Sequence, residues 1–200
     1  MAWVELLEPG DVEGPAREMV ESGEAQYGRV LNTWAAILNR PEIFAAYLPF
    51  VRAVAGPGTV DPRVKDASAF LVGVLNHCRY TVSHRAASAR RNGVDDDDLR
   101  RIAAHDWDDF DPSMRAVLQF TEQLTTRPDD LPYTAGPRAV DREVLDRLSA
   151  DLTDAQVVEL AMSVSLWNAL ARFHRVMGFD LDMPEPPTGT DPASEAGASG

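Results

Sequence analysis

The strongest constraint on the fold is a helical pattern of apolar residues toward the C-terminal end of the chain. After Thr153-Asp-Ala-Gln156, which is typical of a capping box, apolar residues recur every three or four positions. Gly178 follows this run at a position where helices commonly end. The pattern predicts one long amphipathic helix, with an apolar face made of Val157, Leu160, Ala161, Val164, Trp167, Leu170, Phe173 and Met177.

Other segments carry helix start signals of the same kind. Asp61-Pro62 and Asp111-Pro112 each place a side-chain acceptor at a cap and a proline in the first turn. No segment shows sustained strand alternation between turn signals, so the predicted fold class is all-α, a compact multi-helix fold. The remaining helices are expected at about residues 15–22, 30–38, 41–55, 62–76, 78–92, 112–125 and 142–148.

Two acidic segments bear on the domain organisation. Residues 95–111 carry eight Asp against two Arg, but the spacing of Leu99, Ile102, Trp107 and Phe110 indicates a short helix and a loop that dock onto a core. We therefore expect one domain over residues 1–180. Residues 181–200 contain seven Gly or Pro, four acids and no base, which predicts a disordered acidic tail.

Charge and hydropathy exclude several classes of function. With 19 basic and 32 acidic side chains the formal charge is −13, which repels phosphate backbones and anionic membranes. No apolar run is long enough to span a bilayer, and the N-terminal residues lack a secretory signal. We expect a cytoplasmic protein that binds a small molecule, and neither nucleic acid nor a membrane.

Residues 66–84 hold most of the side chains that could carry chemistry. The single cysteine, Cys78, excludes a disulfide within the chain, and a helix restarting near it would place its thiol at a helix N-terminus, where a thiolate is stabilised. His77 and His84 are candidate bases, and Asp66 could order one of them. Buried packing for Cys78 and surface positions for the histidines remain open alternatives. No spacing typical of a metal site or a nucleotide cradle is present.

Several motifs, taken in order, carry a family resemblance. The motifs are Gly28-Arg-Val-Leu-Asn32, Asn39-Arg-Pro-Glu42, the segment from Asp66 to His84, Ala89-Arg-Arg-Asn-Gly93, Arg115 to Glu122, and Val158 to Phe173. In this order and spacing, the chain resembles the carboxymuconolactone decarboxylase superfamily and, within it, the alkylhydroperoxidase D-like branch. The resemblance implies an all-α fold that assembles as a trimer or hexamer, with neither a metal nor an organic cofactor.

The resemblance assigns roles to individual residues. In the redox branch, paired cysteines reduce hydroperoxides, and an acid and a histidine form a proton relay to the thiol. By this comparison Cys78 matches the first cysteine and Tyr80 the residue between the cysteines. Asp66 matches the relay acid, and His84 matches the earlier of the two histidine positions.

The chain also departs from the redox pattern at the site. Thr81 stands in place of the second cysteine, so the usual two-thiol cycle is not available. Arg85 occupies the later histidine position, and Asp66 is one methylene shorter than the family's glutamate.

Three functions follow from these residues. The first is a thiol-dependent peroxide reductase with Cys78, Thr81, His84 and Asp66 as catalytic residues and an external thiol as reductant. The second is a non-redox decarboxylase or lyase in which His84 is the acid or base, Arg85 holds a substrate carboxylate and Cys78 is a bystander. The third is a non-catalytic oligomeric binding protein. Arg85, Tyr80 and His77 are the candidate substrate-binding residues.

Overall fold

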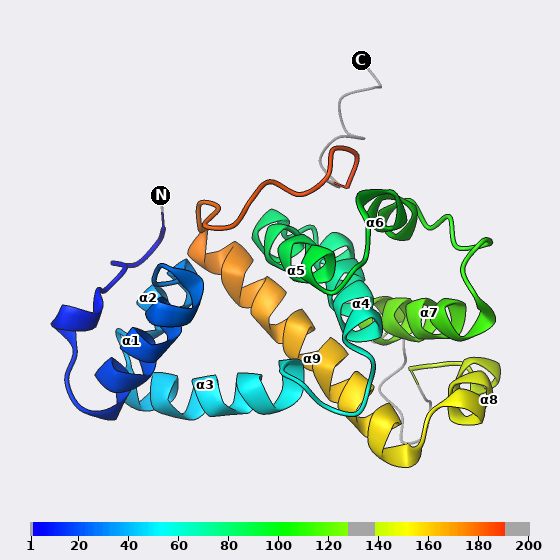
Figure 1. Ribbon diagram of the computed structural model, residues 1–200, viewed down its shortest axis with the longest axis horizontal. Helices are drawn as coiled ribbons and strands as arrows, with labels where there is room; N and C mark the ends of the chain where they lie inside the picture. The colour runs from blue at the N-terminus through cyan, green and yellow to red at the C-terminus, as the bar shows by residue number, and fades with distance from the viewer. Residues whose placement is uncertain (1, 128–138, 191–200) are drawn as a thin grey trace.

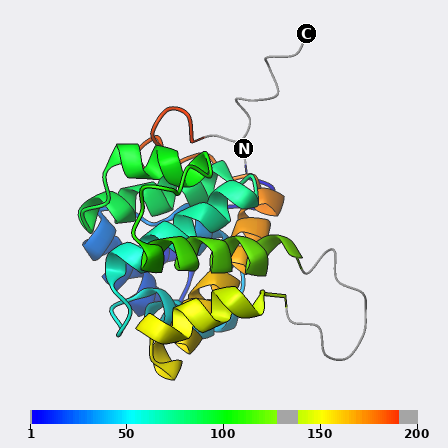
Figure 2. The ribbon, with the colours of Figure 1, turned by 90° about the vertical axis from the view of Figure 1, so that its right-hand side faces the viewer.

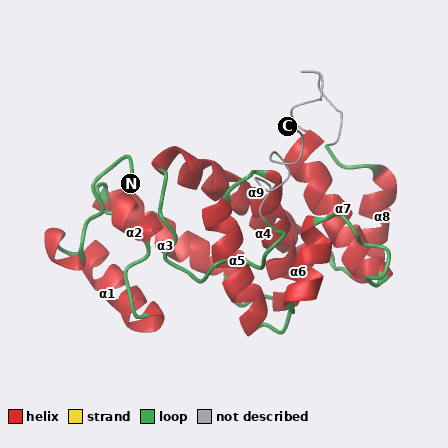
Figure 3. Cartoon of the chain, turned by 90° about the horizontal axis from the view of Figure 1, so that it is seen from above, coloured by secondary structure: helices red, strands yellow, loops and turns green. Residues whose placement is uncertain are grey.

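The computed structural model describes residues 2–127 and 139–190, and these residues form nine α-helices, a short 3₁₀ helix and no strand (Figure 3). This confirms the all-α prediction. No helix in these two ranges is long and apolar enough to cross a membrane. The helices are α1 (Pro15–Tyr27), α2 (Asn32–Ile37), α3 (Pro41–Ala55), α4 (Pro62–Leu75), α5 (Arg79–Arg91), α6 (Asp96–Ala103), α7 (Pro112–Thr126), α8 (Arg142–Asp151) and α9 (Asp154–Met177), and the 3₁₀ helix is η1 (Pro9–Asp11).

The long helix α9 crosses the middle of the molecule and organises the other helices. Helices α1 to α3 lie on one side of it and α4 to α8 on the other (Figure 1). Helix α4 packs against α5, α6, α7 and α9, and seen from the side α7 and α8 lie next to one another (Figure 2). Four apolar clusters result, one around α9 and α7, one between α4, α5 and α6, one within α1 to α3, and a small one around Cys78.

The start and stop signals in the sequence act as predicted. The Asp61 side chain accepts a hydrogen bond from the Arg63 N–H, and Asp111 caps α7 in the same way. Thr153 forms the expected capping box with Gln156 at the start of α9. Gly178 ends α9 with φ +65°, a left-handed conformation that glycine adopts without strain.

Helix α1 is longer than the sequence pattern predicts, because it continues beyond Ser22 to Tyr27. Gly23 does not end it, because the Trp34 ring packs on Gly23, where a Cβ atom would lie 2.3 Å from that ring. The helix ends instead at Gly28, which has φ +73°.

The segment after α9 departs most from prediction. Residues 179–190, here called the C-terminal strap, run over α5 (Figure 1). Phe179 and Leu181 pack on the cluster around Cys78, and Asp182 is only 8% exposed. The prediction of a disordered tail is therefore wrong for residues 181–190, and residues 191–200 lie outside the described residues. The physical reason is that Phe179, Leu181 and Met183 alternate with acids and pack their partly buried side chains against the apolar clusters.

Candidate functional site

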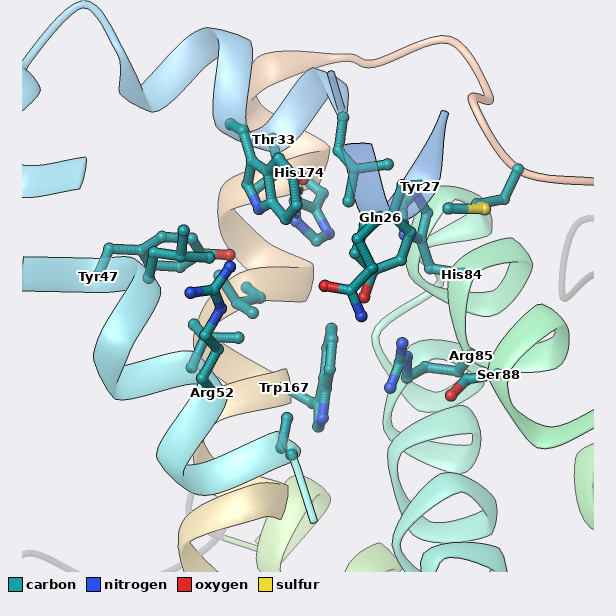
Figure 4. A pocket seen from close by; sticks show the side chains of 18 of the residues that line it. Gln26, Tyr27, Thr33, Tyr47, Arg52, His84, Arg85, Ser88, Trp167 and His174 are labelled. Atoms are coloured by element: carbon teal, nitrogen blue, oxygen red, sulfur yellow. Dashed lines mark hydrogen bonds between the residues drawn. The ribbon is translucent and has the colours of Figure 1, made fainter. Parts of the chain in front are cut away.

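A cavity of about 450 Å³ lies where α1, α2, α3, α5 and α9 meet (Figure 4). Its charged and titratable lining consists of Arg52, Arg85, Arg91, His84 and His174, and no Asp or Glu is among the described residues that line it. A cavity without carboxylates is notable in a chain of formal charge −13. The electrostatic character of the cavity is therefore that of a site for an anion.

His84 is held in one orientation by an acid from the C-terminal strap. Its Nε2 atom lies 2.5 Å from Oδ1 of Asp182. Burial lowers the pKa of His84, and Asp182 opposes this only in part. Burial also works against the charge of Asp182, yet hydrogen bonds from His84, Tyr80 and the Asn32 N–H hold its pKa below the ordinary value.

The lowered pKa values of His84 and Asp182 indicate a neutral imidazole next to an ionised carboxylate. Asp182 is ionised and accepts a hydrogen bond, so neutral His84 carries its proton on Nε2. Among the described residues Nδ1 of His84 has no hydrogen-bond partner. The imidazole therefore offers one unprotonated nitrogen as a base, oriented by a carboxylate.

Arg85 enters the same cavity and is only weakly neutralised. Its Nη1 atom donates to Oδ1 of Asp66 at 3.3 Å, and its guanidinium lies 4.1 Å from the centroid of the Trp167 ring. Its Nε atom is buried without a partner. Asp66 is shared, because its other oxygen accepts from Ser88 Oγ at 3.1 Å and Asn92 Nδ2 at 2.6 Å. A buried guanidinium with one long hydrogen bond can take up a further anionic partner.

Asp66 thus has a different partner from the one predicted. The sequence suggested that Asp66 orders a histidine, but the structure places it against Arg85, while Asp182 takes the position next to His84. The reason is that α4 presents Asp66 to Arg85, Ser88 and Asn92, which share one face of α5.

Cys78 lies outside this cavity. It is the N-cap residue of α5, as the restart of the helix predicted, but its thiol makes no capping hydrogen bond. The residue is 2% exposed, and Thr81 Oγ1 donates to Sγ at 3.2 Å. The same hydroxyl lies 2.9 Å from Nδ1 of His174, a cavity-lining residue whose pKa burial lowers to about 3.

A chain of hydrogen bonds joins these two parts of the site. Nε2 of His174 lies 3.0 Å from Thr33 Oγ1, which in turn lies 3.3 Å from the Tyr80 hydroxyl. Tyr80 donates to Oδ2 of Asp182 at 2.7 Å, and its ring lies 4.3 Å from that of His84. Tyr80 is therefore a buried connecting residue and does not line the cavity.

The structure brings together only part of the predicted site. His84 and Arg85 share the cavity, whereas Thr81 and Tyr80 are buried behind it. His77 is exposed in the turn between α4 and α5, has φ +51° and does not line the cavity.

Two important residues were not among the predicted site residues. His174 lies on the apolar face of α9. Its ring nitrogens contact the hydroxyls of Thr33 and Thr81, which come from other helices. The composition around Asp182 predicts a disordered tail, although the alternation of Phe179, Leu181 and Met183 around it is a local signal of packing. No group of three His, Cys, Asp or Glu in the described part of the chain is arranged to hold a metal ion.

Comparison with known proteins identifies the fold. The sequence profile of the carboxymuconolactone decarboxylase family matches residues 41–123. A peroxidase-related protein from Ralstonia eutropha with the alkylhydroperoxidase AhpD core superposes with a TM-score of 0.77 at 16% identity, covering 90% of this chain and 92% of that one. A peroxidase-related protein from Silicibacter has a TM-score of 0.71 at 15% identity, covering 94% of each chain.

A further similar structure is the debrominase Bmp8, in a cysteine-to-alanine variant in complex with 2,3,4-tribromopyrrole. Its TM-score is 0.72 at 21% identity, covering 95% of this chain and 96% of that one. No curated protein sequence matches the chain. The protein thus has the helical fold of the AhpD-like structures. Its residues 41–123 match the carboxymuconolactone decarboxylase family, which agrees with the resemblance drawn from the sequence.

Proposed function

We propose that this protein is a non-redox enzyme that transfers a proton on a small carboxylated substrate, with His84 as the base and Arg85 as the anchor. The observation that carries this proposal is the convergence of His84 and Arg85 in one cavity from which Cys78 is excluded. Similar folds include both peroxidase-related proteins and a debrominase, so the fold is compatible with more than one chemistry.

His84 accepts the proton at Nδ1, the nitrogen that Asp182 leaves unprotonated. The proton leaves the substrate, the electron pair of the broken bond stays on the substrate, and the ring becomes an imidazolium. Asp182, with Oδ1 at 2.5 Å from Nε2, stabilises that positive charge. Return of the proton to another atom of the substrate regenerates neutral His84.

Arg85 holds the substrate so that the proton faces His84. A carboxylate at the guanidinium would add an anionic partner to a group whose one hydrogen bond among the described residues is the 3.3 Å contact with Asp66. The stacking of Arg85 on Trp167 fixes the plane of the guanidinium, which reduces the conformational entropy lost on binding. The same positive charge stabilises negative charge that develops on the substrate.

A second candidate, the one-cysteine peroxide reductase, has one observation in its favour. The hydroxyl of Thr81 lies within hydrogen-bond distance of both the Cys78 thiol and Nδ1 of His174, which lines the cavity. Against it, the thiol is 2% exposed and does not line the cavity where a peroxide would bind.

Solvent-exchange NMR separates the two functions, because it detects proton transfer on a substrate even where the product has not been identified. The protein is incubated in D₂O with a panel of small carboxylates, and loss of substrate C–H signals is followed. We expect exchange that His84→Gln slows by about 10²- to 10⁴-fold, the usual range for a general base. Cys78→Ser should retain it, and His105→Gln, at an exposed histidine, serves as the matched control.

Two outcomes would contradict the proposal. Exchange at the wild-type rate in His84→Gln would exclude this histidine as the base. Peroxide consumption that disappears in Cys78→Ser, together with no carboxylate exchange in the wild type, would establish the thiol function instead.

A further inference from the structure

The cavity has an aromatic wall built from three helices on one side of α9. The ring centroids of Tyr27 and Trp34 lie 5.5 Å apart, with the rings edge to face. The centroids of Trp34 and Phe44 lie 6.4 Å apart, also edge to face. Phe44 lies 6.5 Å from Tyr47, which extends the aromatic contacts along α3. Tyr27, Trp34 and Tyr47 line the cavity, and the buried Phe44 supports them from behind. The rings are thus held in place by one another.

Trp167 from α9 supplies a further aromatic surface in the cavity. It stands between Arg52 of α3 and Arg85 of α5, and the Tyr47 hydroxyl points toward the cavity (Figure 4). With the rings of Tyr27 and Trp34, four aromatic side chains line a space of about 450 Å³. Aromatic surfaces bind other aromatic rings more strongly than they bind aliphatic groups of the same area.

The positive charge of the cavity is available to a ligand. Arg52 and Arg91 form no ion pair with an acid among the described residues, although the chain has 32 acidic side chains. Arg85 has only its 3.3 Å contact with Asp66. Charge of one sign gathered in a cavity with apolar walls attracts an anion and holds it there.

We infer that the ligand of this cavity is a planar aromatic ring that carries an anionic group, with the anion at Arg85 and the ring among Trp167, Trp34 and Tyr47. This inference rests on the proposed function, because it names the substrate class of the same site. It goes further in specifying the body of the molecule, which an anchoring arginine alone leaves open. The cavity volume fits a compact single or fused ring.

The test uses probes that differ in one property at a time. Binding of 2-naphthoate, the neutral 2-naphthalenemethanol and the saturated decalin-2-carboxylate is measured by isothermal titration calorimetry. We expect naphthoate to bind about ten- to hundredfold more tightly than the neutral alcohol, because the buried guanidinium gains a charged partner. Naphthoate should bind about three- to tenfold more tightly than the saturated acid, because only its ring stacks.

Variants assign each preference to a residue. Arg85→Met should abolish the preference for the anion, whereas Arg63→Met, at an exposed arginine outside the cavity, should leave it intact. Trp167→Leu should abolish the preference for the aromatic ring, whereas Trp167→Phe should retain most of it. Circular dichroism checks that each variant keeps its helices, and the Phe variant tests the ring if the Leu variant does not fold.

The outcomes distinguish this inference from the proposed function. Equal affinity for naphthoate and the saturated acid would overturn the aromatic inference, even if carboxylate exchange depended on His84. Tight, Arg85-dependent binding of naphthoate with no exchange of any carboxylate would support the ligand class and overturn the proposed reaction.

Discussion

His174 should make the folded protein sensitive to acid. The residue is 4% exposed and both ring nitrogens lie against hydroxyls, at 3.0 Å from Thr33 Oγ1 and 2.9 Å from Thr81 Oγ1. Burial lowers its pKa from 6.5 to about 3. Below pH 6.5 the unfolded chain therefore takes up a proton that the folded chain excludes, so stability falls with pH until the folded pKa is reached. At pH 4.5, two units below the unfolded pKa, the loss is about 2.7 kcal/mol.

Urea unfolding at pH 7.5 and pH 4.5 measures this contribution. The drop in the free energy of unfolding between the two pH values should be about 2 to 3 kcal/mol smaller in His174→Gln than in the wild type. The variant also loses hydrogen bonds, but that cost is the same at both pH values and cancels in the difference. His105→Gln, at an exposed position, should keep the wild-type drop. An equal drop in wild type and His174→Gln would refute the reasoning.

Three further outcomes follow from the same structure. Glu159→Gln should destabilise the protein by about 3 to 5 kcal/mol in urea unfolding. The reason is that the variant leaves Lys65, which is 5% exposed, without the carboxylate that lies 2.7 Å from its Nζ atom. A loss below about 1 kcal/mol would contradict this. Asp182→Asn removes a negative charge that raises the pKa of His84. In a plot of exchange rate against pH, the fall in rate on the acid side should therefore move to lower pH, and the maximal rate should fall at least about tenfold. An unchanged pH profile would exclude Asp182 as the orienting acid. Cys78→Ser should leave the exchange rate within about twofold of wild type, and its loss would place the thiol in the reaction.

The helices were predictable because their signals are local. An acid followed by proline fixes the starts of α4 and α7, and Thr153 with Gln156 fixes the start of α9. The end of α1 was not predictable, because Gly23 is accommodated by a contact with Trp34 on another helix. Whether a glycine ends a helix therefore depends on tertiary packing that a single sequence does not display.

The candidate site was predictable only where neighbours in sequence are also neighbours in the site. His84 and Arg85 are adjacent on α5 and both line the cavity. The acid that orients His84 lies 98 positions further along the chain, and nothing in the spacing of residues 66–84 points to it. The composition of residues 181–200 concealed Asp182, because prolines, glycines and acids outweighed the few alternating apolar residues around it.

The position of Asp182 in the chain also sets the order in which the site is assembled during synthesis. The ribosome makes His84, Arg85 and the residues of α1 to α5 well before the C-terminal strap, and their apolar clusters can begin to pack at that stage. Until residue 182 emerges, the His84 ring lacks its carboxylate, and Tyr80 lacks the acceptor of its hydroxyl proton. A nascent chain that stops short of the strap therefore has the cavity-facing arginine but a His84 ring that no carboxylate holds, and the proposed base is oriented only when the last described segment closes over α5.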